Sequence, residues 1–402
     1  MMIGQMHQAA ILPQARPVLS LDFTAGTLPS AASFSRSSTA SYTNSGGVLV
    51  TAAANAPRFD YDPISGAAKG LLIEPQSTNM AATNAWPYRN ASSFSPALAM
   101  NAVGPDGIAN SAWTMPVGTT GWGQENTPIT AGSPWVFSIY VKSLNNAGLF
   151  DFSLGGTWAT GGGIGTLPKY SFATNSFTST IAHVTTTAVP VGNGWLRLSW
   201  ALDAVAVGSS STFLYRVQTD PTASYVAYGP QLESGAVATS YIPTASYTAA
   251  TRAGDNASIA LGAWFNPNAG TVMLGFDVLG YPTSGRLLGF NGQDLGLTVS
   301  DGGSGVAALG TSPSIGLSAT GGGLGALSKA AFGYDANGAA LAANGAAPTS
   351  TANTALASAT WSKFQLLGQW GFNPWSGCGH IRSLSYYNRR LPAGLLQRIT
   401  TP

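Results

Sequence analysis

Segments in which apolar and polar residues alternate recur along this chain at roughly 8–12 residue intervals, separated by glycine-rich turns. In WVFSIYVKS (135–143) the apolar residues Phe137, Ile139 and Val141 alternate with Ser138, Tyr140 and Lys142, which predicts a half-buried strand. In GWLRLSWAL (194–202) the same alternation puts Arg197 and Ser199 on the polar face. A side-chain period of two cannot form the stripe of an amphipathic helix, so the pattern predicts sheets packed on sheets.

The composition favours the same fold class. Only 8% of the 402 residues are charged, against about 25% in an average soluble domain, and Gly alone accounts for 50 positions. The surface must therefore be made of hydroxyls, amides and backbone, with few of the charged residues that favour helices. The 11 Trp, 14 Tyr and 16 Phe are spread along the whole chain, which disordered segments do not show. We predict a folded, all-β protein.

The order of the segments predicts two tandem β-sandwiches. Residues 1–20 hold few strand-forming stretches and suit an N-terminal attachment arm, and 21–78 is expected to be a short β-rich connecting segment. One sandwich is expected over 79–247 and a second over 248–402. A short helix is expected at 392–399, where Pro392 can begin it.

Several classes of function are excluded by what the chain lacks. A net charge of +2 with no basic run longer than two residues offers no face for nucleic acid. No apolar stretch approaches the ~20 residues of a membrane span, so membrane insertion is not expected. A lone Cys378 cannot form an intrachain disulfide, and with only His7, His183 and His380 the chain lacks the ligands of the usual zinc sites. We expect no metal and no cofactor.

Catalysis finds little support in the sequence. A glycosidase needs two carboxylates flanking a bond, and Asp60 with Asp62 is the closest pair in sequence. We interpret both as turn-forming residues that accept backbone N–H bonds. Cys378 and His380 would share one face of a strand without a third, orienting group, so Cys378 is expected to be a buried small hydrophobe. No nucleophile elbow, metalloprotease motif or phosphate loop occurs, and we expect no enzyme.

Sugar binding makes smaller demands: an exposed aromatic plane and nearby hydroxyl or amide groups. Five aromatic residues in loop-like contexts are therefore candidate glycan-binding residues: Trp86, Trp122, Trp158, Tyr281 and Trp375. Five other tryptophans sit inside strand patterns and are expected in the cores: Trp113, Trp135, Trp195, Trp200 and Trp264. Packing over a sandwich end or in a subunit interface is the alternative for each loop residue.

Four segments carry resemblances to known families. RFDYDPISGAAKGLLIEPQSTN (58–79) resembles a segment that recurs in tail-fibre, receptor-binding and spike proteins of tailed phages and gene-transfer particles. GPQLESGAVATSYIPT (229–244) is similar to the segment that ends the family's next module, and TRAGDNAS (251–258) resembles its exit. GHIRSLSYYNRRLPAGLLQRIT (379–400) is similar to the end of concanavalin- and laminin-G-like sandwiches.

The resemblance implies a lectin-like protein. Residues 79–247 would form a carbohydrate-binding-module-like jelly roll and 248–402 a concanavalin/laminin-G-like sandwich. The chain would be a virion component made in the cytoplasm of the bacterial host, a tail-fibre or spike subunit that binds host-surface polysaccharide. It would associate with itself as a homotrimer and with other tail, baseplate or head proteins through residues 1–20. No catalytic residue carries over from the family.

Two alternatives stay open at this point. A head-decorating or baseplate protein could use the same lectin-like folds only as packing modules. A polysaccharide depolymerase is a third possibility, of a different class. The exposure of the loop tryptophans and the release of reducing ends would distinguish the three.

Overall fold

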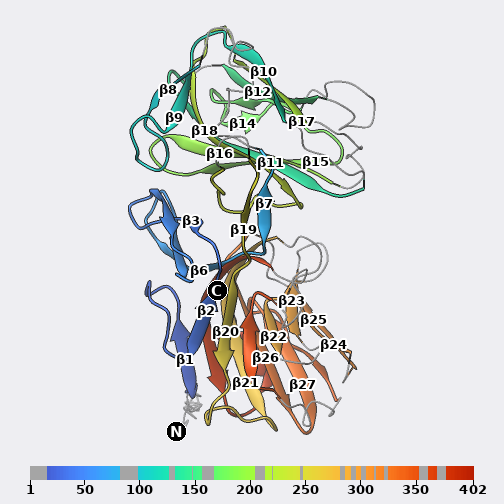
Figure 1. The fold of residues 1–402 in the computed structure, drawn as a ribbon. Coiled ribbons are helices and arrows are strands. Elements are labelled where there is room, and N and C mark those ends of the chain that lie inside the picture. The colour runs from blue at the N-terminus through green and yellow to red at the C-terminus, as the bar shows by residue number, and fades with distance from the viewer. Residues whose placement is uncertain are drawn as a thin grey trace, which may run out of the picture.

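The structure is a computed structural model. It describes the following residues: 16–81, 98–125, 132–146, 148–155, 167–203, 213–219, 221–244, 248–280, 286–290, 296–299, 305–311, 314–320, 325–352, 361–368 and 377–402. These residues contain thirty strands and one helix, α1 (Ala393–Ile399). Most of the strands form two sandwiches stacked end to end, so the all-β prediction is confirmed (Figure 1).

The first unit, which we call the central sandwich, is built from a six-stranded and a five-stranded sheet. The six-stranded sheet runs in the order β15 (Val184–Pro190), β16 (Trp195–Leu202), β11 (Trp135–Ser143), β18 (Tyr225–Ser234), β9 (Ala112–Met115) and β8 (Ala99–Ala102). The five-stranded sheet runs β10 (Thr120–Glu125), β17 (Phe213–Thr219), β12 (Leu149–Gly155), β13 (Tyr170–Ser171) and β14 (Ser176–Phe177). The chain crosses repeatedly between the two sheets.

The core of the central sandwich is rich in aromatic side chains, including Trp200, which is fully buried. The expected core positions of Trp113 and Trp135 are confirmed by exposures of 6 and 8%, whereas Trp195, 3% exposed, is buried with Tyr140 and Tyr241 on the outer face of the sheet. One prediction needs correction. Strand β11 is buried on both faces and not on one, because it lies inside its sheet and Tyr140, on its outer face, packs under Tyr241 at the junction with the second unit.

The second unit, which we call the terminal sandwich, is built from an eight-stranded and a seven-stranded sheet. The eight-stranded sheet runs β28 (Thr349–Thr351), β27 (Gly338–Ala343), β26 (Ser328–Asp335), β21 (Gly270–Gly280), β30 (Cys378–Tyr387), β6 (Ala68–Ile73) and β5 (Arg58–Tyr61), with β1 (Leu19–Asp22) also on β30. The seven-stranded sheet runs β2 (Ala32–Ser35), β20 (Asn256–Ala260), β29 (Lys363–Leu366), β22 (Leu288–Phe290), β23 (Gly296–Val299), β24 (Gly305–Thr311) and β25 (Ser314–Thr320).

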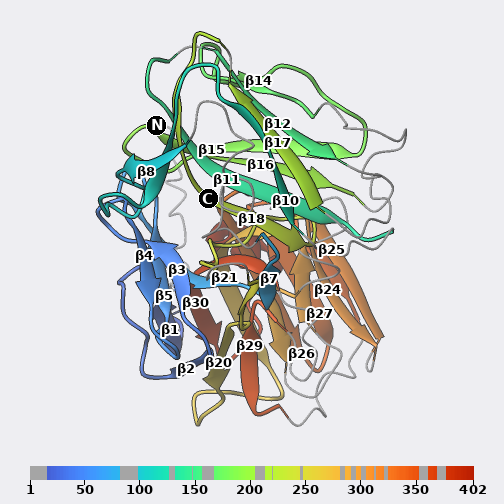
Figure 2. The same ribbon diagram turned by 45° about the horizontal axis from the view of Figure 1, so that its top comes forward.

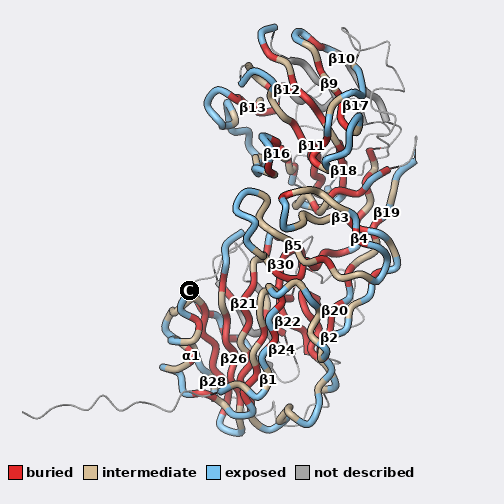
Figure 3. The backbone as a smooth tube through the Cα atoms, turned by 90° about the vertical axis from the view of Figure 1, so that its left-hand side faces the viewer, coloured by how far each residue is buried: buried red, intermediate tan, exposed pale blue. Residues whose placement is uncertain are grey.

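Residues 21–78 are part of the terminal sandwich and not only a connecting segment, which the sequence did not predict. Strand β1 pairs with β30 in the register Leu19↔Tyr386, β2 pairs with β20, and β6 pairs with β30. The apolar side chains of this segment, such as Phe23 and Leu71, are fully buried in the core of the terminal sandwich. The terminal sandwich is therefore discontinuous in sequence, and the central sandwich is inserted between its two parts (Figure 3).

Helix α1 lies where the sequence placed it, with Pro392 at the N-cap position and not inside the first turn. Leu396 is fully buried and Leu395 and Ile399 pack beside it on the outer face of the eight-stranded sheet. Trp264 packs, partly buried, against the core on the inner face, in line with its expected core position. Within the described ranges, no helix is long and apolar enough to cross a membrane.

Two small sheets occupy the junction between the sandwiches. Strands β7 (Ser77–Asn79) and β19 (Ala250–Arg252) form the antiparallel ribbon by which the chain leaves and re-enters the terminal sandwich. The hairpin of β3 (Ala40–Thr43) and β4 (Leu49–Ala52) reaches the central sandwich, where the Leu49 N–H donates to the Pro105 carbonyl over 3.0 Å (Figure 2). The junction is thus bridged at two places.

Candidate functional site

A cluster of buried charges lies at the junction, and we call it the junction clasp: Arg36, Arg58, Glu74, Arg252 and Asp255. Arg58 is at its centre and is completely buried. One of its terminal nitrogens donates to Glu74 over 2.7 Å, and the other donates to Asp255. Arg36 donates to Asp255 over 3.0 Å, and Arg252 lies 3.5 Å from Glu74.

Glu74 links this cluster to the central sandwich. Its carboxylate accepts hydrogen bonds from the Ser240 backbone N–H and hydroxyl, both at 2.6 Å. Burial alone would raise the pKa of Glu74, but Arg252, Arg58 and the two Ser240 bonds outweigh it and hold that pKa well below its ordinary value. The carboxylate stays ionised, so Glu74 cannot serve as a general acid at neutral pH.

The segments that carry the family resemblance supply all of the clasp residues except Arg36. Asn79 is completely buried; its amide donates to the carbonyl oxygens of Pro230 and Ile242 and accepts from the Leu232 N–H. Glu233, also buried, accepts from Ser77 over 2.6 Å. The buried polar residues of these motifs therefore help to join the two sandwiches.

Two glycines of these motifs have conformations that a side chain would not tolerate. Gly70 has φ +105°, and a Cβ there would collide with the Ile381 carbonyl oxygen. Gly229 has φ +56°, and its Cβ would lie 2.8 Å from the Tyr241 ring. Glycine is required at both because the backbone must pass close to a neighbour at positive φ.

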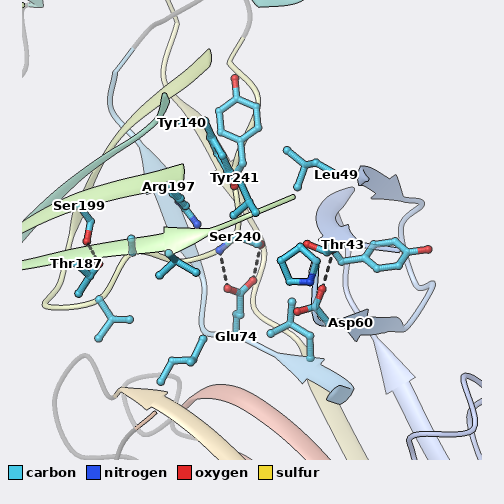
Figure 4. Close-up of a pocket in the computed structure, with 18 of the residues that line it drawn as sticks. Thr43, Leu49, Asp60, Glu74, Tyr140, Thr187, Arg197, Ser199, Ser240 and Tyr241 are labelled. Atoms are coloured by element: carbon cyan, nitrogen blue, oxygen red, sulfur yellow. Dashed lines mark hydrogen bonds between the residues drawn. The ribbon is translucent and has the colours of Figure 1, made fainter. Parts of the chain in front are cut away.

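A cleft of about 410 Å³ opens beside the clasp, between the outer face of the six-stranded sheet and the β3–β4 hairpin with β5 and β6. Figure 4 shows Arg197, Thr187 and Ser199 on the side of the central sandwich, and Leu49, Thr43 and Asp60 on the other side. Tyrosines and small apolar side chains also line the cleft, among them Tyr42, Tyr61, Val136, Val189, Val191 and Val237. The site is an amphipathic cleft formed by parts of both sandwiches.

The acidic groups that face this cleft are already bound. Asp60 accepts from the Thr43 N–H over 2.7 Å and lies 3.0 Å from Nε2 of His380. His380 is 1% exposed and has Asp277 on its other side, 3.5 Å from Nδ1. Burial would raise the pKa of Asp277, but the neighbouring His380 side chain outweighs burial and holds that pKa below its ordinary value.

Asp60 accepts a backbone N–H bond, from Thr43, as the sequence predicted, but it does not form a turn, because it lies within β5 and faces His380 on β30. The turn-forming prediction is confirmed for Asp62, which accepts from the backbone N–H groups of Ile64 and Ser65. Cys378 is 2% exposed, and burial raises the pKa of its thiol, so the prediction of a buried small hydrophobe is confirmed.

The arrangement in the cleft offers binding groups more readily than catalytic ones. The two carboxylates that line it, Asp60 and Glu74, are engaged with His380 and with the arginines of the clasp. Across the described ranges, no group of three or more His, Cys, Asp or Glu side chains could hold a metal ion. What remains available are hydroxyls, tyrosines and the cations Arg197 and Lys69.

The five candidate residues from the sequence receive no structural test. Trp86, Trp158, Tyr281 and Trp375 lie outside the described residues. Trp122 lies on β10, where only the backbone is described. The cleft itself was missed, although the alternation in 194–202 already placed Arg197 and Ser199 on the polar face of their strand.

Comparison with known proteins gives only distant similarity. No protein-family model and no curated protein matches this sequence. The carbohydrate-binding module CBM40 of the Ruminococcus gnavus IT-sialidase, bound to α2,3-sialyllactose, is 18% identical over 34% of this chain and 84% of its own, with a TM-score of 0.30. Trypanosoma rangeli sialidase in complex with the inhibitor DANA is 18% identical, and only 25% of its chain matches 36% of this one, with a TM-score of 0.29.

The domains LG4-5 of the mouse laminin α1 chain match 67% of this chain and 90% of their own at 11% identity, with a TM-score of 0.22. All three TM-scores are too low for an argument about ligands or activity. The chain has weak structural similarity to carbohydrate-binding and laminin G domains and a lectin-like β fold.

Proposed function

We propose that this chain is a tail-fibre or spike subunit of a phage-like particle and that it binds glycans on the host surface. The observation that carries the glycan-binding part is the cleft between the sandwiches, with its tyrosines, hydroxyls and small apolar side chains. Sugars are bound by this combination, because apolar and aromatic groups cover their C–H faces and hydroxyls satisfy their edges. The particle part rests on the resemblance of residues 58–79 and 229–244 to proteins of that family.

The subunit would act within an assembly. The part of residues 1–20 that precedes β1 would attach it to other tail, baseplate or head proteins, and three copies would associate around an axis. Because only 8% of residues are charged, such copies can pack side by side without burying many ions. Three weak sites would then gain through avidity. Light scattering of the purified chain, coupled to size-exclusion chromatography, tests the number of copies.

A glycan array probed with the complete chain tests the binding function. Binding to bacterial surface polysaccharides that is abolished when Thr187 and Arg197 are both replaced, and kept when Arg398 on the distant helix α1 is replaced, is the expected result. An array with no signal would contradict glycan binding. New reducing ends in the incubated polysaccharide would instead identify a depolymerase. Imaging the intact particle with this chain located in it tests the assignment to the tail.

A second candidate function keeps the particle without the ligand. The observation that favours it is the junction clasp, which fixes the two lectin-like units to each other as building blocks. In that case the cleft would be covered by a neighbouring subunit in the particle, and replacing Arg197 would change assembly but not adsorption to cells.

A further inference from the structure

The cleft contains an imbalance of available charge. Five ionisable side chains other than tyrosines line it: Asp60, Lys69, Glu74, Arg197 and His380. Glu74 is neutralised from behind by Arg58 and Arg252, and Asp60 uses both oxygens on Thr43 and His380. Both carboxylates therefore already have partners within the protein, and the side chains with donors to spare are the cations Arg197 and Lys69.

Arg197 can offer an anion more hydrogen-bond donors than Lys69 can. Its guanidinium donates one hydrogen bond, from Nη2 to the Ser138 hydroxyl over 2.9 Å, and lies over the Tyr140 ring with 5.2 Å between Cζ and the ring centre. Stacking on the ring fixes the plane of the guanidinium without using its N–H groups. A side chain held in this way is preorganised for a planar carboxylate, which it can bind with two parallel hydrogen bonds.

Lys69 adds a second positive charge from the other wall. Its side chain is 29% exposed, and its ammonium group lies 4.0 Å from Asp277, the outer limit of an ion pair. An ammonium this loosely paired remains available to an incoming anion. Its strand, β6, belongs to the terminal sandwich, and Arg197 belongs to the central one, so both units contribute to the site.

The surroundings of Arg197 suit a sugar ring better than a free ion. On the neighbouring strand β15, Thr185, Thr187 and Val189 all face outward into the cleft. Thr187 shares a hydrogen bond of 2.6 Å with Ser199, which leaves further acceptor positions on both hydroxyls. Hydroxyl partners and an apolar contact lie next to the cation, as a pyranose bearing a carboxylate would require.

We propose that the cleft binds a carboxylated sugar, with Arg197 as the partner of the carboxylate and Lys69 as a second cation. This inference rests on the proposed glycan-binding function and names its ligand class. The shared chemistry is a carboxylate on a pyranose, which a hexuronic acid and a nonulosonic acid both carry.

Isothermal titration of the complete chain with matched pairs of ligands tests this. One pair is an oligogalacturonide and the same oligomer with its carboxyl groups reduced, and the other is sialyllactose and lactose. We expect one acidic member to bind about tenfold or more tighter than its neutral partner, because a hydrogen bond to a charged group contributes about 1.5–3 kcal/mol. The pair that shows this difference identifies the source, and the affinity should fall as salt is added.

Arg197→Gln should remove the preference for the acidic member, and Lys69→Gln should weaken it several-fold. Arg398→Gln makes the same charge change on an exposed residue of α1 and should have no effect. Should Arg197→Gln lose its cooperative unfolding transition, the result for Lys69→Gln alone would decide, because the Lys69 side chain is partly exposed.

Failure of this inference can be distinguished from failure of the proposed glycan-binding function. Equal binding of acidic and neutral members, unaffected by Arg197→Gln or Lys69→Gln, would overturn this inference and leave glycan binding in place. No binding of any oligosaccharide, here or on the array, would contradict the proposed function and this inference together.

Discussion

The two sandwiches use the same architecture but are assembled differently. All strands of the central sandwich lie between Ala99 and Ser234, in one continuous stretch, around a core rich in aromatic residues. The terminal sandwich has a mostly aliphatic core that joins Leu21 and Phe23 to Leu384 and Tyr386, from opposite ends of the chain. The closure of a loop of this length costs entropy that local strand pairing does not. Residues 79–247 should therefore fold by themselves, whereas residues 248–402, which are only part of the terminal sandwich, should not.

The largest expected effect is on isolated fragments. Residues 79–247 should give a dispersed NMR spectrum and a cooperative thermal transition. Residues 248–402 should remain unfolded or aggregate, because they lack β1, β2, β5 and β6 and expose the unpaired edge of β30. The control is a chain in which a short Gly-Ser linker replaces 82–247, which should restore the fold. A folded 248–402 fragment would break the comparison.

Replacement of Arg58, at the centre of the junction clasp, should have the second-largest effect. Arg58→Met leaves the carboxylates of Glu74 and Asp255 buried without their main partner, and should lower the free energy of unfolding by about 3–5 kcal/mol in urea titrations. The matched control is Arg390→Met, since the ion pair of Arg390 with Asp335 is 22% and 27% exposed. That change should cost under about 1 kcal/mol. Equal effects would mean that the clasp does not stabilise the junction.

Two matched core substitutions sharpen the contrast. Leu198 and Leu384 are both fully buried, one in each sandwich, and replacing either by Ala should cost about 2–5 kcal/mol. Hydrogen exchange should show which segments each substitution destabilises. Leu198→Ala should increase exchange in the central sandwich alone, and Leu384→Ala should increase it in both end segments, 19–73 and 256–387, together. Exchange confined to one end segment would contradict a single terminal unit.

The smallest expected effect is a dependence on pH. The pKa of Glu74 in the folded chain lies below its ordinary value of 4.5, so its contribution to stability is complete above about pH 4.5 and is lost as pH falls below it. One group of this kind accounts for about 2 kcal/mol between pH 4.5 and 3. Thermal unfolding across this range measures it. Glu74→Gln should flatten the curve, and an unchanged slope would exclude Glu74 as its source.

Much of the local structure could be predicted from the sequence. The alternation in 135–143 and 194–202 located β11 and β16, and the expected core residue Trp200 is completely buried. Helix α1 and the turn at Asp62 were also correctly placed. These features depend on a residue and its near neighbours, which the sequence displays directly.

The candidate site could not be found in that way. The glycan-binding candidates were chosen for their loop contexts, whereas the cleft is lined by strand residues such as Arg197 and Thr187 and by Asp60 from a distant strand. The motif residues Arg58 and Glu74 were recognised by resemblance, but their spacing did not indicate that they bind each other and Asp255.

The sequence by itself determined that this chain forms strands, which of their faces are apolar, and that few ionisable groups are available for chemistry. Only the tertiary structure decided that residues 19–73 complete the sandwich of residues 256–387, and that two cations face one cleft. The reason is physical: alternation is a property of neighbouring residues, whereas strand partners and buried ion pairs are chosen by packing among segments nearly two hundred residues or more apart.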